Sequence, residues 1–111
     1  MAIHDARLLD LTFHALADPT RREMLAMVAR RGECTAGQLG EPFDIAQPTA
    51  SKHLRVLEDA GLVRRRIDGR VHWFRIEPAP LDEVDHWLAR HRRFWQKTLT
   101  RLGDALGDLQ R

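Results

Sequence analysis

The chain has 111 residues, 43% of them hydrophobic and 31% charged, with a formal net charge of +2 at pH 7. This balance is typical of one globular domain and excludes a disordered chain. No stretch of ten residues lacks Asp, Glu, Lys or Arg, and Cys34 is the one cysteine, which excludes a transmembrane helix, an internal disulfide and a cysteine-based zinc finger.

The polar residues 1–7 do not form the apolar core of a signal peptide, so we expect a protein of the reducing cytoplasm with no membrane partner. The charge is unevenly placed. Residues 47–75 hold seven basic and three acidic side chains, whereas residues 1–46 hold five and seven. A local basic block indicates a face for a polyanion, and an ordinary solvated surface is the alternative.

The first helix is predicted over about residues 5–17 and has two apolar faces, which indicates contacts on two sides. One face comprises Leu9, Phe13 and Leu16, and the other comprises Leu8, Leu11 and Ala15. Asp18 and Pro19 then fit the N-cap and the first position of a second helix that reaches about Arg31.

The next segment is typical of a helix-turn-helix. Thr35 and Gln38 fit a capping box that opens a short helix, which ends near Pro42. A further helix is predicted over about residues 47–60, with an inward stripe of Ala50, Leu54 and Leu57. A second helix in this arrangement can enter the major groove of DNA.

Residues 62–67 and 70–76 alternate with period two around Asp68-Gly69, a strong hairpin signal. A basic hairpin directly after a helix-turn-helix is a wing that can lie along phosphates. The predicted fold class is therefore mainly α, more strictly α+β. It is one winged helix-turn-helix domain over residues 1–111, in the order of four helices, a β-hairpin and a last helix.

The last helix is predicted over about residues 81–106, with apolar side chains every three to four positions. Trp87 and Phe94 add a flank one heptad apart. This apolar face is wider than one small core can cover, so it needs a partner.

The outward side chains of the fourth helix suit base recognition. Gln47 can pair with adenine, Ser51 can accept or donate, and Lys52 can reach guanine or phosphate. Arg55 and the hairpin arginines suit the DNA backbone, although Ser51 and Lys52 would also fit ordinary exposed positions. The predicted DNA-binding residues are Gln47, Pro48, Thr49, Ser51, Lys52, His53, Arg55, Arg64, Arg66 and Arg70.

Three segments carry a resemblance to a known family: residues 15–22 (ALADPTRR), 47–57 (QPTASKHLRVL) and 60–63 (AGLV) with the hairpin that follows. Over about residues 8–100 the chain resembles the ArsR-type winged-helix transcriptional repressors. The resemblance implies a homodimer built from the first and last helices and an inverted-repeat operator in double-stranded DNA. The predicted dimerisation residues are Leu8, Leu11, Trp87, Phe94, Trp95, Leu99 and Leu102.

The sequence departs from this family in two places. Ala46 stands where relatives often have a capping Ser, so the fourth helix lacks a cap unless Asp44 or Gln47 substitutes. The metal-sensing pattern is also missing, because Cys34 has no second thiol nearby and Asp85, His86 and His91 lack the ligand spacing. We therefore predict no metal site and no cofactor.

Several alternatives stay open. A metal-sensing repressor could combine His86 or His91 of one chain with His4 or His14 of another. Cys34 could be a redox sensor, and the tryptophans could line a small-molecule pocket. A protein-interaction module using the Trp-rich last helix is the rival from another class. The sequence has no phosphate-binding glycine loop, His-Glu-x-x-His motif or paired nucleophile and base, so we expect no enzyme activity.

Overall fold

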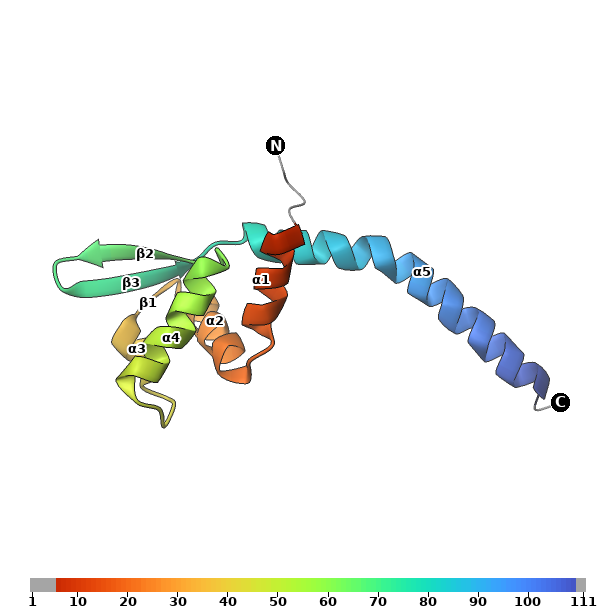
Figure 1. Ribbon diagram of the computed structural model, residues 1–111, viewed down its shortest axis with the longest axis horizontal. Helices are drawn as coiled ribbons and strands as arrows, with labels where there is room; N and C mark the ends of the chain where they lie inside the picture. The colour runs from red at the N-terminus through yellow and green to blue at the C-terminus, as the bar shows by residue number, and fades with distance from the viewer. Residues whose placement is uncertain (1–5, 110–111) are drawn as a thin grey trace.

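The computed structural model describes residues 6–109 and consists mainly of helices with one small antiparallel sheet (Figure 1). The elements are α1 (Ala6–Leu16), α2 (Pro19–Arg31), β1 (Glu33–Thr35), α3 (Ala36–Gly40), α4 (Gln47–Asp59), β2 (Val63–Asp68), β3 (Val71–Ile76) and α5 (Ala79–Leu109). The predicted order of four helices, a hairpin and a last helix is confirmed.

Local capping fixes where α2 and α3 begin. The Asp18 carboxylate accepts from the backbone N–H of Arg21 at 3.0 Å, and Pro19 follows in the first turn, where its missing N–H costs nothing. Thr35 and Gln38 form both bonds of the predicted capping box, at 3.1 and 2.9 Å. The first turn of α4, by contrast, has no side-chain cap at Ala46, so neither Asp44 nor Gln47 substitutes.

Strand β1 was not predicted from the sequence. It pairs antiparallel with β3, which makes the sheet three-stranded in the order β1-β3-β2. Three residues are too few to show a period of two, and such a strand is stable only because β3 satisfies its backbone groups. The pairing places Cys34 opposite Phe74, and both side chains are buried.

The core lies between α2, α3, α4 and the sheet. Its largest fully buried side chains include Met24, Leu39, Leu57, Leu62 and Phe74. Burying each such side chain contributes roughly 1.5–3 kcal/mol, which holds the inward side of α4 against α2. Gly40 lets α3 approach α4 closely, because a Cβ there would lie 3.3 Å from the Cβ of Ala50.

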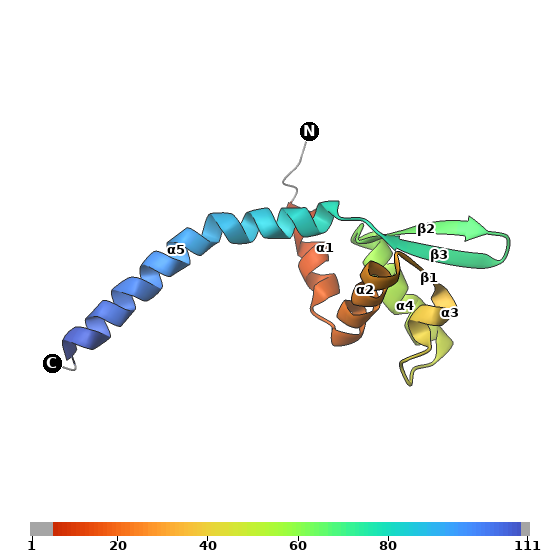
Figure 2. The same cartoon turned by 180° about the vertical axis from the view of Figure 1, so that it is seen from behind.

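Helix α5 begins at Ala79, two residues before the predicted start, because Pro80 fits within a first helical turn. It also runs beyond the predicted end, to Leu109. Figures 1 and 2 show it leaving the domain as a long arm, so only its first turns pack on α1. None of the helices within residues 6–109 is long and apolar enough to cross a membrane.

Candidate nucleic-acid interface

Helix α4 presents a polar face opposite its buried stripe. Ala50, Leu54 and Leu57 are buried against the core. The predicted DNA-binding residues Gln47, Pro48, Thr49, Ser51, Lys52 and Arg55 are all exposed. The packing of one side of the helix therefore fixes the direction in which the other side faces.

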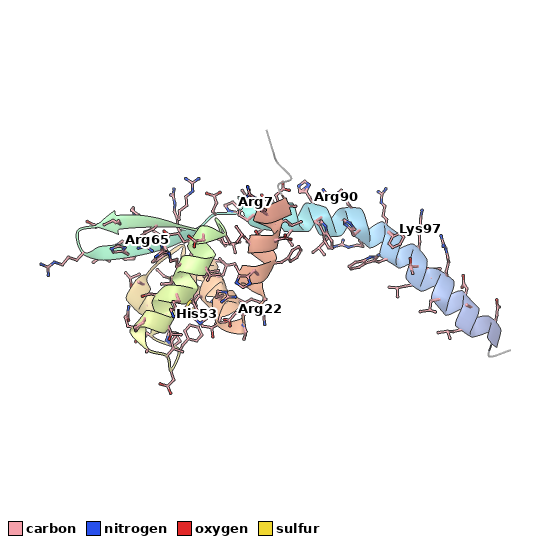
Figure 3. The ribbon with its side chains drawn as sticks, in the orientation of Figure 1. Arg7, Arg22, His53, Arg65, Arg90 and Lys97 are labelled. Carbon is pink, nitrogen blue, oxygen red and sulfur yellow. The ribbon has the colours of Figure 1, made fainter. Side chains whose placement is uncertain are left out.

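His53 is placed differently from these residues. Its side chain is 18% exposed and lies where α4 passes α2 (Figure 3). The Nδ1 atom is 3.4 Å from the Arg21 guanidinium and 3.9 Å from Asp18 Oδ2. The backbone N–H of Arg21, and then the charges of His53 and Arg21, lower the pKa of the Asp18 carboxyl. His53 thus lies at the edge of the exposed face of α4.

The wing, the hairpin of β2 and β3, carries arginines that are mostly ion-paired. Arg64 contacts Glu77 at 2.8 Å and Arg66 contacts Glu33 at 3.0 Å. The hydrogen bond from Arg66 lowers the pKa of Glu33, and the same bond raises the pKa of Arg66. The predicted phosphate contacts of Arg64 and Arg66 thus involve side chains that also have carboxylate partners, which their spacing in the sequence does not indicate.

Arg70 is the exposed cation at the tip of the wing. It follows Gly69, whose φ of 62° allows the tight turn, and no ion pair involves Arg70 within residues 6–109. The tip therefore presents a guanidinium that makes no ion pair within the described residues.

Arg65 was missed in the sequence analysis. Its guanidinium donates to both carboxylate oxygens of Glu58, at 2.9 and 3.0 Å, and to His72 Nδ1 at 3.0 Å. It also lies over the Phe74 ring, 5.1 Å from the centroid. These contacts connect the end of α4 to both strands of the wing. No short sequence motif predicts such a connection.

The predicted dimerisation residues lie on α1 and α5. Leu8 and Leu11 are exposed on α1, and Phe94, Trp95, Leu99 and Leu102 are exposed along the arm of α5. Trp87 is half-buried where the two helices meet, with Phe13 at 5.7 Å and Trp95 at 6.1 Å between ring centroids. A hollow of about 640 Å³ lies beside this aromatic cluster, between α1, the end of α4 and the start of α5, and Leu8 and Trp87 help to line it.

Comparison with known proteins places this geometry in a family. A helix-turn-helix domain family matches residues 16–66. The HTH-type transcriptional regulator Rv2034 of Mycobacterium tuberculosis is 34% identical over 102 residues, which cover 89% of this chain and 92% of that protein. A crystal structure of an ArsR family transcriptional regulator, 41% identical, covers 84% of this chain and 95% of its own, with a TM-score of 0.78.

The chain belongs to the ArsR-type winged helix-turn-helix transcriptional regulators. The predicted resemblance, the fold class and the role as a DNA-binding regulator are confirmed by these matches. The arsenic resistance transcriptional regulator ArsR1 of Pseudomonas putida is 35% identical over 78 residues. That segment covers 58% of the length of ArsR1.

The candidate ligands for a sensing site are dispersed in this ArsR-type chain. Cys34 is fully buried, and its thiol donates to the carbonyl oxygen of Met27 at 3.7 Å. His91 stacks on Trp87 and donates from Nδ1 to its carbonyl oxygen at 2.7 Å. Within the described residues no three His, Cys, Asp or Glu side chains gather into a metal site, and His4 lies outside those residues.

Proposed function

We propose that this regulator is a homodimeric repressor that covers an inverted-repeat operator in double-stranded DNA and responds without a bound metal. The observation that carries the proposal is the exposed polar face of α4, held by a buried stripe directly opposite. A helix with this support can lie in a major groove with its orientation fixed.

The proposed contacts divide into base readers and backbone contacts. Gln47, Ser51 and Lys52 reach base edges from the exposed face of α4. Pro48 and Thr49, in its first turn, lie beside the sugar-phosphate backbone, and Arg55 contacts phosphate further along the helix.

The wing supplies phosphate contacts from a second element. Arg70 at its tip makes no ion pair within the described residues, whereas the Arg64 and Arg66 side chains are 66% and 51% exposed beside their carboxylates. We expect Arg70 to contribute more to the salt-dependent affinity than either paired arginine.

A second copy of this chain is the proposed partner for the apolar faces of α1 and α5. Phe94, Trp95 and Leu99 are each at least half exposed in one copy, and they lie along one arm. Contiguous apolar surface of this kind marks a protein interface, and a twofold dimer buries the same patch on both copies. The partner would also cover Leu8 and Trp87 beside the hollow.

The proposed dimer implies how this regulator represses transcription. Two copies of α4 in one dimer bind half-sites about one helical turn, roughly 10 bp, apart. A dimer on a promoter excludes polymerase sterically, which is the repression we propose. Chromosomal DNA as the target implies action in the cytoplasm, and we expect no enzyme activity.

Metal independence is supported by the ligand supply of the described chain. A tight zinc site needs about four ligands at fixed geometry, whereas the thiol of Cys34 is buried and no three His, Cys, Asp or Glu side chains of residues 6–109 gather at one place. The alternative is a metal-sensing repressor whose site joins His86 or His91 to His14 of a second copy.

Selection of bound sequences from random duplex DNA tests the proposed function. The wild-type chain should select an imperfect inverted repeat. Gln47→Ala or Ser51→Ala should relax the selected sequence and cost roughly 1–3 kcal/mol at specific sites only. An unchanged selected sequence in both variants would contradict the assignment of α4, and salt-insensitive binding would favour the protein-interaction module.

A further inference from the structure

The side chain of Arg21 joins the end of α1 to the recognition helix α4. Its Nε donates to the Ala15 carbonyl oxygen at 2.8 Å, and one terminal nitrogen donates to the His14 carbonyl oxygen at 2.9 Å. The other terminal nitrogen lies 3.4 Å from Nδ1 of His53. Both carbonyls belong to the last turn of α1. The His14 carbonyl oxygen also accepts from the backbone N–H of Ala17 at 3.2 Å, so the bond from Arg21 is its second.

This contact favours one tautomer of His53. A guanidinium has five N–H donors and no acceptor, so His53 Nδ1 must accept in the bond with Arg21. In neutral imidazole the proton then lies on Nε2. Asp18 Oδ2 is 3.9 Å from the same Nδ1, too far for a hydrogen bond, and it already accepts from the backbone N–H of Arg21.

We propose that Arg21 is a positioning residue that holds His53 with its proton on Nε2, so that Nε2–H donates to a phosphate of the operator. The inference rests on the proposed DNA contacts of α4, and it adds Nε2 of His53 as a hydrogen-bond donor to phosphate. His53 follows Lys52 in the chain and lies at the edge of the exposed face, 18% exposed, where an N–H donor meets backbone phosphate before it meets a base.

The Arg21 guanidinium also connects the helix that carries part of the proposed dimer interface, α1, to the helix that carries the proposed DNA contacts, α4. Helix α1 carries Leu8 and Leu11 of the proposed interface, and its last turn is bound to Arg21, which contacts α4 at His53. Helix α1 also packs directly on α4, and Arg21 adds a hydrogen-bonded connection between their ends.

Arg22 provides a matched control. It is the next residue on α2, and within the described part of the chain its side-chain hydrogen bond goes to the Leu16 carbonyl oxygen, at 2.7 Å. Arg21→Gln and Arg22→Gln thus remove the same charge and disturb the same end of α1, but only Arg21→Gln removes a contact with α4.

The first experiment determines the tautomer of His53, because this measurement needs no DNA. Nitrogen-15 NMR of the wild-type protein at about pH 8 should show His53 with its proton on Nε2. Arg21→Gln should give a mixture of tautomers, and Arg22→Gln should leave the wild-type signal unchanged.

Operator affinity is the second measurement. Arg21→Gln should weaken binding about tenfold, and Arg22→Gln no more than about twofold. His53→Gln, whose amide can place an N–H near the Nε2 position, should bind more tightly than His53→Asn. Thermal unfolding of each variant identifies any loss of affinity that comes from loss of the fold.

A wild-type His53 with its proton on Nδ1, or equal losses in Arg21→Gln and Arg22→Gln, would overturn the positioning role. If Gln47→Ala still relaxes the selected sequence in that case, the proposed interface stands and only the role of Arg21 fails. If Gln47→Ala, Arg21→Gln and His53→Asn all bind the operator as wild type does, the proposed interface fails with it.

Discussion

Arg65 and Glu58 form a bidentate ion pair across the turn that joins α4 to the wing, with N–O distances of 2.9 and 3.0 Å. Glu58 belongs to the last turn of α4 and Arg65 to β2. Because Arg65 also lies over the Phe74 ring, one side chain connects the end of α4 to both strands of the wing.

Removal of this pair should loosen the wing more than it destabilises the fold. We expect Arg65→Ala to lower the free energy of unfolding by no more than about 1 kcal/mol, since both side chains are partly exposed. Amide hydrogen exchange in β2 and β3 should rise relative to α2, because α2 keeps its core contacts. Glu58→Gln should show the same pattern, and exchange that rises equally throughout the chain would contradict it.

The Asp18 cap should give a pH-dependent contribution to stability. Asp18→Ala should cost about 1 kcal/mol near pH 7. The folded-state pKa of Asp18 is lowered, first by the N–H of Arg21. Its ionised form therefore stabilises the fold above the ordinary value of 3.8, and this contribution is lost as the pH falls through the lowered pKa.

Urea unfolding of Asp18→Ala at pH 7 and at successive steps down to pH 3 measures this loss. Asp18→Asn is the control, because asparagine still caps but does not titrate in this range. A difference between wild type and Asp18→Ala that stays constant below pH 3.8 would show that the carboxylate charge is not what stabilises α2.

The tip of the wing should contribute sequence-independent affinity. Arg70→Ala should weaken binding to all duplexes alike and reduce the slope of log K against log salt by about one. Arg66→Ala is the comparison, because Glu33 already neutralises Arg66, and its effect on the slope should be smaller. Titrations of operator and random duplex at several salt concentrations measure both slopes, and an unchanged slope for Arg70→Ala would place the tip away from the DNA.

The apolar arm of α5 should hold a dimer together. Light scattering at micromolar concentration should give about twice the chain mass of 12.8 kDa. Trp95→Glu with Leu99→Glu should give a monomer that keeps its helical circular dichroism and loses operator affinity. Gln96→Glu, on the polar side of α5 beside Arg93 and Lys97, should remain dimeric. A wild-type monomer would contradict both the dimer and the two-half-site mechanism.

Metals should not release the operator. Zinc, nickel, cobalt and arsenite titrated against the protein–operator complex should leave it intact at micromolar free metal, because no ligand set is assembled in the described chain. Release at micromolar or lower metal that His86→Ala or Cys34→Ser abolishes would establish the metal-sensing alternative. Such release needs a metal that binds the free and DNA-bound states differently.

The sequence by itself determined the parts of this protein that depend on near neighbours. Asp18 and Thr35 predict the starts of α2 and α3, because each side chain accepts a hydrogen bond from a backbone N–H three residues later. Asp68-Gly69 predicts the hairpin because the two residues form the turn themselves. The period of 3.6 separates the buried Ala50 stripe of α4 from its exposed polar face, so the candidate DNA-binding residues of α4 follow from the sequence alone.

Only the tertiary structure decided the features that depend on distant segments. Strand β1 exists because β3 pairs with it, and Arg66 is neutralised by a carboxylate 33 positions away. His53 lies toward α2 because Arg21, 32 positions earlier, contacts it. Periodicity and capping describe the chain over a few residues, whereas hydrogen bonds and ion pairs between separate elements depend on how those elements pack, so the electrostatic state of the wing and the orientation of His53 could not be predicted from spacing.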